Sequence, residues 1–134
     1  MTRAQMTSDS PTTGAPELTV VVPSYNEREN VPELARRLGE VLAGVAWEMI
    51  VVDDDSPDGT SALVKDLSRS DPRIRCIRRV GRRGLAGACI EGMLASSAPV
   101  VAVMDADLQH DETILPAMLE KIRGGAELVV ASRN

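Results

Sequence analysis

Apolar and polar positions along this chain form blocks that predict short strands separated by helices. Runs of apolar, often β-branched residues begin near residues 18, 47, 74, 99 and 127, and each run has the length of a strand. Between the runs, apolar residues recur every three or four positions, which is the period of an amphipathic helix. The strand starts are 25 to 29 residues apart, the spacing of successive βαβ units. The sequence therefore predicts an α/β fold, with a mostly parallel sheet and helices on both faces.

The individual elements differ in how strongly the sequence marks them. We expect the first helix to start at Asn30 as its N-cap and to stop at Gly44. The third strand is more polar than the others, which favours a place near the edge of the sheet. The fourth strand is a continuous apolar run, which is typical of a strand buried on both faces. The further expected elements are helices around 62–67, from 85 to 94 and around 114–122, and a fifth strand over 127–131.

Length and composition restrict the class of protein. The chain has 134 residues, enough for one domain, and its 43% hydrophobic content is ordinary for a globular fold. A net charge of −5 and the scarcity of aromatic residues argue against a nucleic-acid partner. Residues 1–17 are rich in Ser, Thr and Pro, so we expect a disordered tail followed by one domain over 18–134. No apolar run is long enough to span a membrane, so we expect any membrane contact to be peripheral or made by another chain.

The sequence excludes several kinds of catalytic site. Cys76 and Cys89 are too few for a zinc site, even together with the single His110. We interpret them as two buried, reduced thiols in a cytoplasmic protein. No serine is placed to use His110 as a base, and neither a G-x-G-x-x-G loop after the first strand nor a P-loop occurs. The pattern therefore gives no support to a dinucleotide fold or a P-loop enzyme.

Two carboxylates follow the fourth strand directly. Asp105 and Asp107 are separated by Ala106, and if the backbone stays extended both side chains point to the same side. A bound cation would relieve their repulsion. Oxygen ligands of this kind favour Mg²⁺ or Mn²⁺. An alternative is that Asp105 caps the following helix and Asp107 is a solvated loop residue.

The other polar clusters also follow strands. Tyr25 and Glu27 follow the first strand, three aspartates over 53–55 follow the second, and four arginines over 78–83 follow the third. In an open parallel sheet, ligands bind beyond the carboxyl ends of the strands. A ligand that suits both carboxylates and arginines is a phosphate-bearing molecule with a divalent cation. The aspartates over 53–55 could equally cap a helix, and the glycines at 81, 84 and 87 could simply give a flexible helix start or bring amides and arginines to a diphosphate.

Taken together, five motifs resemble a known family. They are residues 22–27 (VPSYNE), 50–60 (IVVDDDSPDGT), 83–88 (RGLAGA), 104–110 (MDADLQH) and 131–133 (ASR). Their order and spacing are similar to those of family 2 glycosyltransferases with the GT-A fold, and most similar to polyprenyl-phosphate (dolichyl-phosphate) mannose synthases. The chain departs from the family in having Arg82 and Arg83 before Gly84, and Ala86 where glycine is frequent. The resemblance implies that the chain holds the N-terminal, donor-binding part of a catalytic domain that continues beyond Asn134.

The resemblance also implies roles for individual residues. The donor would be GDP-mannose, the acceptor a polyprenyl phosphate, and the reaction a metal-dependent mannosyl transfer with inversion at the inner face of the membrane. The implied metal ligands are Asp105, Asp107 and Gln109, with the two aspartates as the catalytic pair. The implied substrate-binding residues are Pro23, Tyr25, Glu27, Asp53, Asp54, Asp55, Arg83, Ala106 and Arg133.

Other functions remain compatible with these residues. The donor could be another nucleotide sugar such as UDP-glucose, because no residue fixes guanine over uracil. The chain could be a non-catalytic nucleotide- or metal-binding fragment that associates with itself or with a partner. A receiver-type domain phosphorylated on Asp105 is a third reading. It lacks the usual strand-end lysine, because Lys65 and Lys121 are the only lysines and both fall on predicted helices.

Overall fold

The fold is an α/β sandwich built on one parallel sheet. The computed structural model describes residues 15–108 and 112–125. Within them, four strands are arranged in the order β3-β2-β1-β4 and every neighbouring pair is parallel. The strands are β1 (Leu18–Ser24), β2 (Trp47–Asp53), β3 (Ile74–Arg78) and β4 (Val100–Val103). The α/β class and parallel sheet predicted from the sequence are confirmed.

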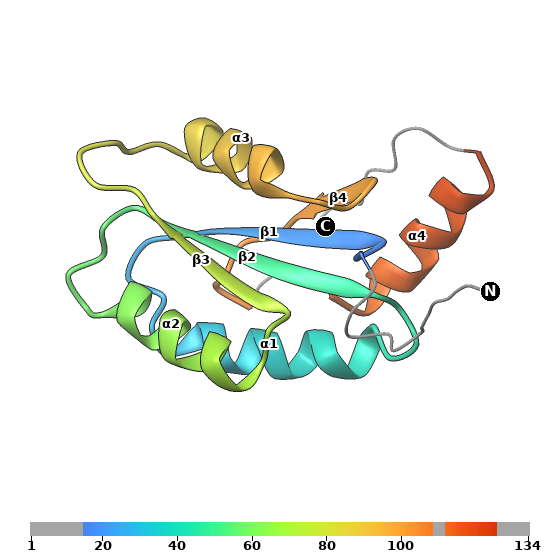
Figure 1. Cartoon of the computed structure of the whole chain (residues 1–134), viewed down its shortest axis with the longest axis horizontal. Helices are drawn as coiled ribbons and strands as arrows, with labels where there is room; N and C mark the ends of the chain where they lie inside the picture. Colours follow the sequence, from blue (N-terminus) through green and yellow to red (C-terminus); the bar gives the residue numbers. More distant parts are fainter. Residues whose placement is uncertain (1–14, 109–111, 126–134) are drawn as a thin grey trace, which may run out of the picture.

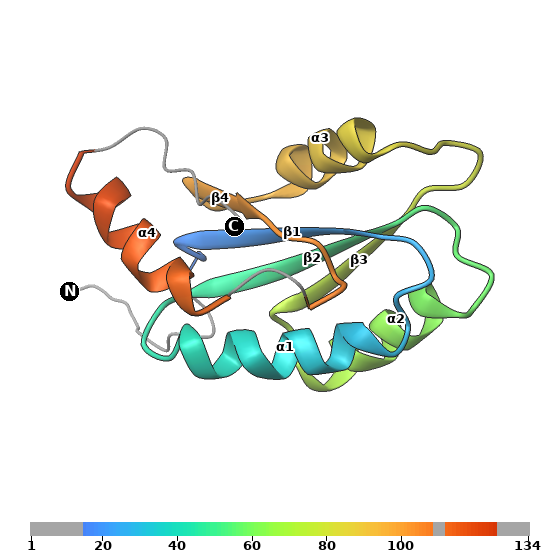
Figure 2. The ribbon, with the colours of Figure 1, turned by 180° about the vertical axis from the view of Figure 1, so that it is seen from behind.

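Helices cover both faces of this sheet. In Figures 1 and 2, α1 (Asn30–Val41) and α2 (Thr60–Ser70) lie on one face and α3 (Leu85–Ala95) lies on the other. A short 3₁₀ turn, η1 (Glu112–Ile114), leads into α4 (Leu115–Arg123), which lies beside the sheet near the start of β1 (Figure 1). Each helix ends close to the position that the sequence indicates, and α2 ends at Asp71 as its C-cap.

The two faces of the sheet bury alternate residues of each strand, as the period of two requires. Val20 and Val22 of β1 pack with α1 and α2 in the larger core, whereas Val21 packs toward Ala88 of α3 in the smaller one. All seven residues of β2 are buried. The continuous apolar runs of β1 and β2 are therefore explained by helices on both faces.

Helix α3 turns its small residues toward the sheet. A Cβ added at Gly92 would lie 2.4 Å from Cγ1 of Val21 and 3.2 Å from Cγ2 of Val52, so only glycine allows this close approach. The larger apolar residues of α3 point outward. Leu85 is 63% exposed, Ile90 56%, Met93 46% and Leu94 80%. We call these four residues the outer stripe of α3.

Two sequence-based expectations about the elements are wrong. β4 is not buried on both faces, because its residues are half-buried and Val103 is 40% exposed. In the described residues β4 pairs only with β1, and α3 packs on β1 and β2. Asn30 is not the N-cap of α1. The N-cap is Glu29, and the side-chain amide of Asn30 instead donates a hydrogen bond to Oε2 of Glu27 at 2.7 Å.

Three further expectations concern the edge strand, the thiols and the chain ends. β3 lies at an edge of the sheet, as its polar residues indicate. Cys76 and Cys89 are free thiols, as expected, but each is only partly buried. Burial raises the pKa of both thiols. The fifth strand predicted over 127–131 and the tail predicted over 1–17 lie wholly or largely outside the described residues.

Candidate functional site

The order of the strands places a switch point between β1 and β4. From β1 the chain moves outward through β2 and β3, then returns to the other side of β1 as β4. In open parallel sheets, ligands bind beyond the carboxyl ends of the strands at such a point. The residues that follow β1 and β4 begin with Tyr25 and Met104. Two of the polar clusters found in the sequence, Tyr25 with Glu27 and Asp105 with Asp107, thus follow the two strands that flank the switch point.

The loops after β1 and β2 are joined to each other by hydrogen bonds. The amide of Asn26 donates to Oγ of Ser56 at 2.8 Å, and the amide of Arg28 donates to Oδ2 of Asp58 at 3.3 Å. Asp58 also accepts a hydrogen bond from the amide of Thr60, the first residue of α2. Asn26 has a φ of 57°, in the left-handed region. These bonds fix the segment that carries Tyr25 and Glu27 against the loop that follows β2.

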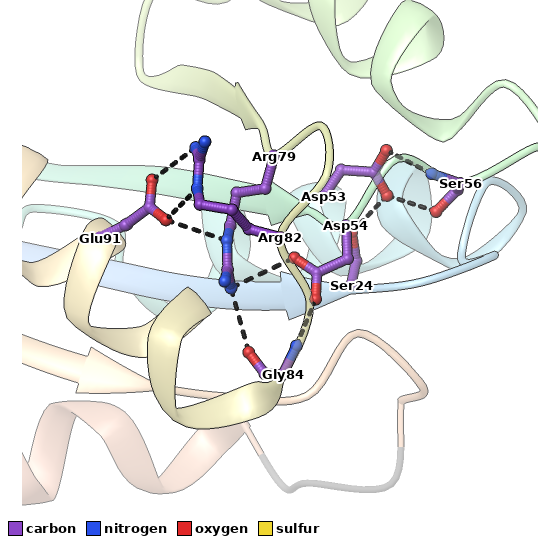
Figure 3. A network of polar contacts seen from close by, with 8 residues as sticks. All are labelled: Ser24, Asp53, Asp54, Ser56, Arg79, Arg82, Gly84 and Glu91. Carbon is purple, nitrogen blue, oxygen red and sulfur yellow. Dashed lines mark hydrogen bonds and ion pairs between the residues drawn. The ribbon is translucent and has the colours of Figure 1, made fainter.

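Asp53, the first of the three aspartates, is inside the protein. It is fully buried, and its carboxylate accepts hydrogen bonds from the amide and hydroxyl of Ser56 and a longer one, 3.4 Å, from Oγ of Ser24. Both oxygens are therefore occupied by the protein (Figure 3). The position of Asp53 suits it to hold the loops after β1 and β2, so any effect on a bound base would be indirect.

Asp54 and Asp55 lie nearer the surface and interact with the loop after β3. Oδ2 of Asp54 accepts a hydrogen bond from the amide of Gly84 at 3.0 Å. Asp55 has a φ of 58°, and its Oδ1 accepts hydrogen bonds of 2.8 and 2.6 Å from Arg78. These two side chains therefore link the carboxyl ends of β2 and β3.

The arginines at the end of β3 and in the loop after it are not a free basic surface. Arg79 is buried and lies between Asp54 and Glu91, and Arg82 donates two hydrogen bonds to Glu91 (Figure 3). These bonds from Arg82 hold the pKa of the Glu91 carboxyl below its usual value. Arg78 pairs with Asp55, as described above. Three of the four arginines are thus neutralised by carboxylates of the same protein.

The fourth arginine, Arg83, contacts Tyr25. Its Cζ lies 4.6 Å from the centroid of the Tyr25 ring, and its Nη2 donates a hydrogen bond of 3.2 Å to the Tyr25 hydroxyl. Tyr25 is 42% exposed. Two residues predicted to bind the substrate, 58 positions apart in sequence, are thereby brought together at the carboxyl edge of the sheet. Pro23 is half-buried within β1, two residues before Tyr25.

The segment after β4 turns instead of staying extended. Ala106 and Asp107 form a turn, and Leu108 has a φ of 63°. Ala106 is buried, whereas Asp105 is half-buried and Asp107 is exposed. The Asp105 carboxylate adds to the effect of burial in raising the pKa of the Cys89 thiol, which places it near α3.

The metal site itself is only partly described. Gln109 and Arg133, predicted as a metal ligand and a phosphate contact, lie outside the described residues, as does His110. Within residues 15–108 and 112–125, no group of three His, Cys, Asp or Glu side chains could hold a metal ion. Asp105 and Asp107 alone supply two carboxylates of the hard-oxygen type that Mg²⁺ and Mn²⁺ accept.

Sequence reasoning missed the roles of Arg79, Glu91 and Ser56. In the sequence Arg79 belongs to a basic stretch over 78–84, and nothing in that stretch distinguishes the buried arginine from the exposed ones. Glu91 is the single charged residue of α3, and a lone charge in an otherwise apolar helix was the signal that could have revealed it. Ser56 follows the three aspartates directly, where a hydroxyl can satisfy a buried carboxylate.

A second polar cluster lies at the opposite, amino edge of the sheet. Glu48 is buried and accepts hydrogen bonds from Oγ1 of Thr19 at 2.6 Å, Nη1 of Arg75 at 2.8 Å and the amide of Ser97 at 3.3 Å. Burial alone would raise the pKa of Glu48, but these hydrogen bonds and the Arg75 charge bring it below its usual value. This cluster joins β1, β2, β3 and the residues before β4, far from the switch point.

The chain is similar to proteins with known names. The family model described as glycosyl transferase family 2 matches residues 19–134. A dolichol-phosphate mannosyltransferase from Pyrococcus furiosus is 43% identical over 117 residues, which are 87% of this chain and 33% of that protein. A polyprenol monophosphomannose synthase from Mycolicibacterium smegmatis is 36% identical over 137 residues, covering 98% of this chain and 51% of that protein. The chain thus spans about a third to a half of these relatives.

Solved structures with the same arrangement also exist. A mannosyltransferase from Pyrobaculum calidifontis, in complex with GDP-Man and Mn²⁺, has a TM-score of 0.58 and 29% identity, covering 72% of this chain and 29% of that one. A glucosyl-3-phosphoglycerate synthase from Mycobacterium tuberculosis has a TM-score of 0.65 at 20% identity, covering 85% and 42%. The second comparison supports the fold alone.

Among the described residues, no helix is both long and apolar enough to cross a bilayer.

Proposed function

The chain belongs to glycosyl transferase family 2, and we propose that it supplies the donor-binding part of a transferase that moves mannose from GDP-mannose to a polyprenyl phosphate. One observation carries the proposal: Tyr25, Asp54 and Asp105 lie just beyond the ends of β1, β2 and β4, and Arg83, from the loop after β3, contacts Tyr25 at the same carboxyl edge of the sheet. The names of the Pyrococcus and Mycolicibacterium relatives support the lipid phosphate acceptor, and the Pyrobaculum complex supports the donor.

In this proposal, the nucleoside lies over the ends of β1 and β2. Pro23, Tyr25 and Glu27 contact it from one side, and Asp54 and Asp55 flank the base from the other. Asp53 supports this surface from inside through Ser56. Arg83 leaves its position over the Tyr25 ring or shares that ring with the base, since its guanidinium now occupies one exposed face.

The diphosphate lies toward β4 in the same proposal. Asp105, Asp107 and Gln109 hold a divalent cation, Mg²⁺ or Mn²⁺, and Ala106 and Arg133 approach the sugar diphosphate. The cation would supply neutralisation of the charge that develops on the leaving nucleoside diphosphate. Asp105 and Asp107 suit this role because Asp105 is only half-buried and Asp107 is exposed, so a cation could reach them without a rearrangement of the core.

The acceptor explains why the site needs no strong base. A polyprenyl phosphate is already an anion, so its oxygen can attack the sugar with inversion without losing a proton first. The lipid requires the site to work at a membrane surface, and we propose peripheral contact at the inner face. The receiver-type alternative is not favoured, because the family match covers the whole of the described sheet.

Calorimetric titration tests the donor. In the presence of Mn²⁺, we expect the chain to bind GDP-mannose more tightly than UDP-glucose, and addition of EDTA to remove the binding. A clear preference for UDP-glucose would show that GDP-mannose is not the donor. We expect the isolated 134 residues to bind nucleotide weakly and to transfer no mannose to a short polyprenyl phosphate. Turnover by this chain as a monomer, measured with radiolabelled donor and light scattering, would show that these residues suffice for transfer and are more than a donor-binding part.

A further inference from the structure

Arg79 lies at the centre of the polar network drawn in Figure 3. It follows β3 directly, its side chain is only 4% exposed, and its backbone amide donates to the carbonyl of Asp53 at 2.8 Å. Its Nη1 donates a hydrogen bond to the carbonyl of Gly84 at 3.0 Å and lies 3.3 Å from Oδ1 of Asp54. Its Nε lies 3.0 Å from Oε2 of Glu91. One guanidinium thus connects β2, the loop after β3 and helix α3.

Gly84 is held from both sides by this network. Its carbonyl accepts from Arg79, and its amide donates to Oδ2 of Asp54. Gly84 has a φ of 120°, a conformation that favours glycine. It stands between Arg83, which contacts Tyr25, and Leu85, the first residue of α3. The ion pair of Arg79 and Asp54 therefore fixes the backbone at the point where the Arg83 side chain leaves the loop.

This pair is a poor device for stability alone. Burying two charges costs desolvation energy that their attraction often fails to exceed. Oδ1 of Asp54 and Nε of Arg79 are buried without a well-directed hydrogen bond in the described structure, so even the pairing is incomplete. The distinctive result of the arrangement is geometric: it sets the Gly84 backbone and holds the Asp54 carboxylate in one orientation.

We propose that Arg79 is a positioning residue for the nucleotide donor, holding Asp54 and Gly84 so that Arg83 faces Tyr25. The proposal rests on the proposed function, since it assumes that Tyr25, Asp54 and Arg83 bind the nucleotide. Arg79 itself is too deeply buried to touch a ligand. It acts through the residues that surround it.

Gly87 offers a way to move Arg79 without removing its charge. A Cβ added at Gly87 would lie 2.8 Å from Nη2 and 3.4 Å from Cζ of Arg79. Because the Arg79 side chain is only 4% exposed and its guanidinium contacts Asp54, Gly84 and Glu91, a displacement disturbs at least one of these contacts. Gly87 lies in the first turn of α3, where alanine favours the helix more than glycine does. The substitution should therefore not weaken the helix itself, and a loss of nucleotide affinity in Gly87→Ala would come from the displaced guanidinium.

The first test is calorimetric titration of GDP, with Mn²⁺ present, into the full chain and its variants. We expect Arg79→Gln and Gly87→Ala to lower the affinity about tenfold or more, the size of one lost charge-assisted contact. Arg79→Lys keeps the charge, but a lysine cannot contact Asp54, Gly84 and Glu91 at once. Compared with Arg79→Gln, it should restore the free energy of unfolding more than the affinity for GDP. If Arg79→Gln fails to fold, Gly87→Ala and Arg79→Lys still decide the question.

Two controls separate positioning from general damage. Arg75→Gln breaks the ion pair between Arg75, whose side chain is 43% exposed, and the buried Glu48 toward the opposite end of β3. Gly39→Ala adds a Cβ within α1, where no atom lies within 4 Å. Both should keep the GDP affinity of the original chain to within about twofold, although Arg75→Gln lowers the free energy of unfolding. All titrations are made at temperatures where circular dichroism shows each variant to be folded.

The second test needs no nucleotide. Tyr25 is the single tyrosine of the chain, so its ring gives one set of aromatic NMR signals, which report the guanidinium that lies over it. We expect Arg79→Gln and Gly87→Ala to shift these signals toward those of Arg83→Ala, and Arg75→Gln to leave them unchanged. If the original chain binds no GDP, the proposed function fails, and the Tyr25 signals still decide the positioning role. Unshifted Tyr25 signals in Arg79→Gln and Gly87→Ala, or unchanged GDP affinity in these two variants, would overturn the positioning role of Arg79.

Discussion

The guanidinium of Arg83 lies over the ring of Tyr25 and also donates a hydrogen bond to the Tyr25 hydroxyl. Both side chains are exposed at the carboxyl edge of the sheet. At an exposed site such a cation–π contact contributes about 0.5–1 kcal/mol. The contact is therefore too weak to support the fold, and strong enough to hold two ligand-facing side chains in a defined arrangement.

Arg83→Ala should consequently separate binding from stability. We expect the free energy of unfolding, measured with urea, to change by less than about 1 kcal/mol. The affinity for GDP should fall about tenfold, because the variant loses a charge-assisted contact with the nucleotide, which is worth about 1.5–3 kcal/mol. A variant that loses several kcal/mol of stability while binding GDP normally would show that the Tyr25 contact is structural.

Replacing Asp107 with alanine tests the metal site. Asp107 is exposed in a turn beyond β4, so its loss should change the free energy of unfolding by no more than about 0.5 kcal/mol. We expect Asp107→Ala to abolish Mn²⁺-dependent GDP binding, measured by calorimetry. Asp66→Ala, which removes an exposed carboxylate on α2, is the matched control and should bind normally. Unchanged Mn²⁺ affinity in Asp107→Ala would remove this residue from the metal ligands.

Gly92→Ala tests the close packing of α3 on the sheet. The added methyl group would lie 2.4 Å from Cγ1 of Val21, a fully buried atom of the core, so α3 must move outward. Overpacking of this kind costs about 1–3 kcal/mol. Gly39→Ala, in the open part of α1, should instead stabilise the protein by about 0.5–1 kcal/mol. Urea unfolding of both variants checks the expected opposite signs, and a stable Gly92→Ala would mean that α3 packs more loosely than described.

The lowered pKa of Glu48 determines how the stability of the protein should change in acid. Its pKa is lowered in the folded protein by Thr19, Arg75 and the Ser97 amide, which outweigh burial. A depressed folded pKa stabilises the protein above the unfolded pKa, about 4.5, and this stabilisation is lost as the pH falls through the folded value. We expect the urea midpoint to drop between about pH 5 and pH 3.

The corresponding variant isolates this contribution. Glu48→Gln cannot ionise, so its urea midpoint should be lower at neutral pH and should depend less on pH across the same interval. Arg75→Gln should also weaken the dependence, because it removes one of the groups that lower the Glu48 pKa. An equally steep acid transition in Glu48→Gln would assign the effect to other carboxylates.

The sheet could be predicted from the sequence because its signals are local. Continuous apolar runs mark β1 and β2 as buried strands, and polar residues mark β3 as an edge. The strand order could not be read in this way, since nothing within a strand says which neighbour it will have. The half-exposed state of β4 likewise depends on what lies beside it, which a run of valines does not record.

The site was predictable to the level of residue clusters but not of contacts. Tyr25 and Asp105 stand out because each follows a strand directly. The burial of Arg79 was not predictable, because it needs Asp54, Gly84 and Glu91 from three segments at once. The orientation of α3 was hidden for a different reason. Apart from Glu91 the helix is wholly apolar, so no polar face indicates which side meets solvent.

The outer stripe of α3 has a consequence for the colloidal behaviour of the protein. Leu85, Ile90, Met93 and Leu94 present uncharged surface, and the net charge of −5 is what keeps two molecules apart at neutral pH. The sequence has a pI of about 4.9, so near this pH the mutual repulsion vanishes while the apolar stripe stays exposed. Solutions of the chain should therefore be clearest at low salt and alkaline pH, and should turn turbid on mild acidification before the sheet unfolds.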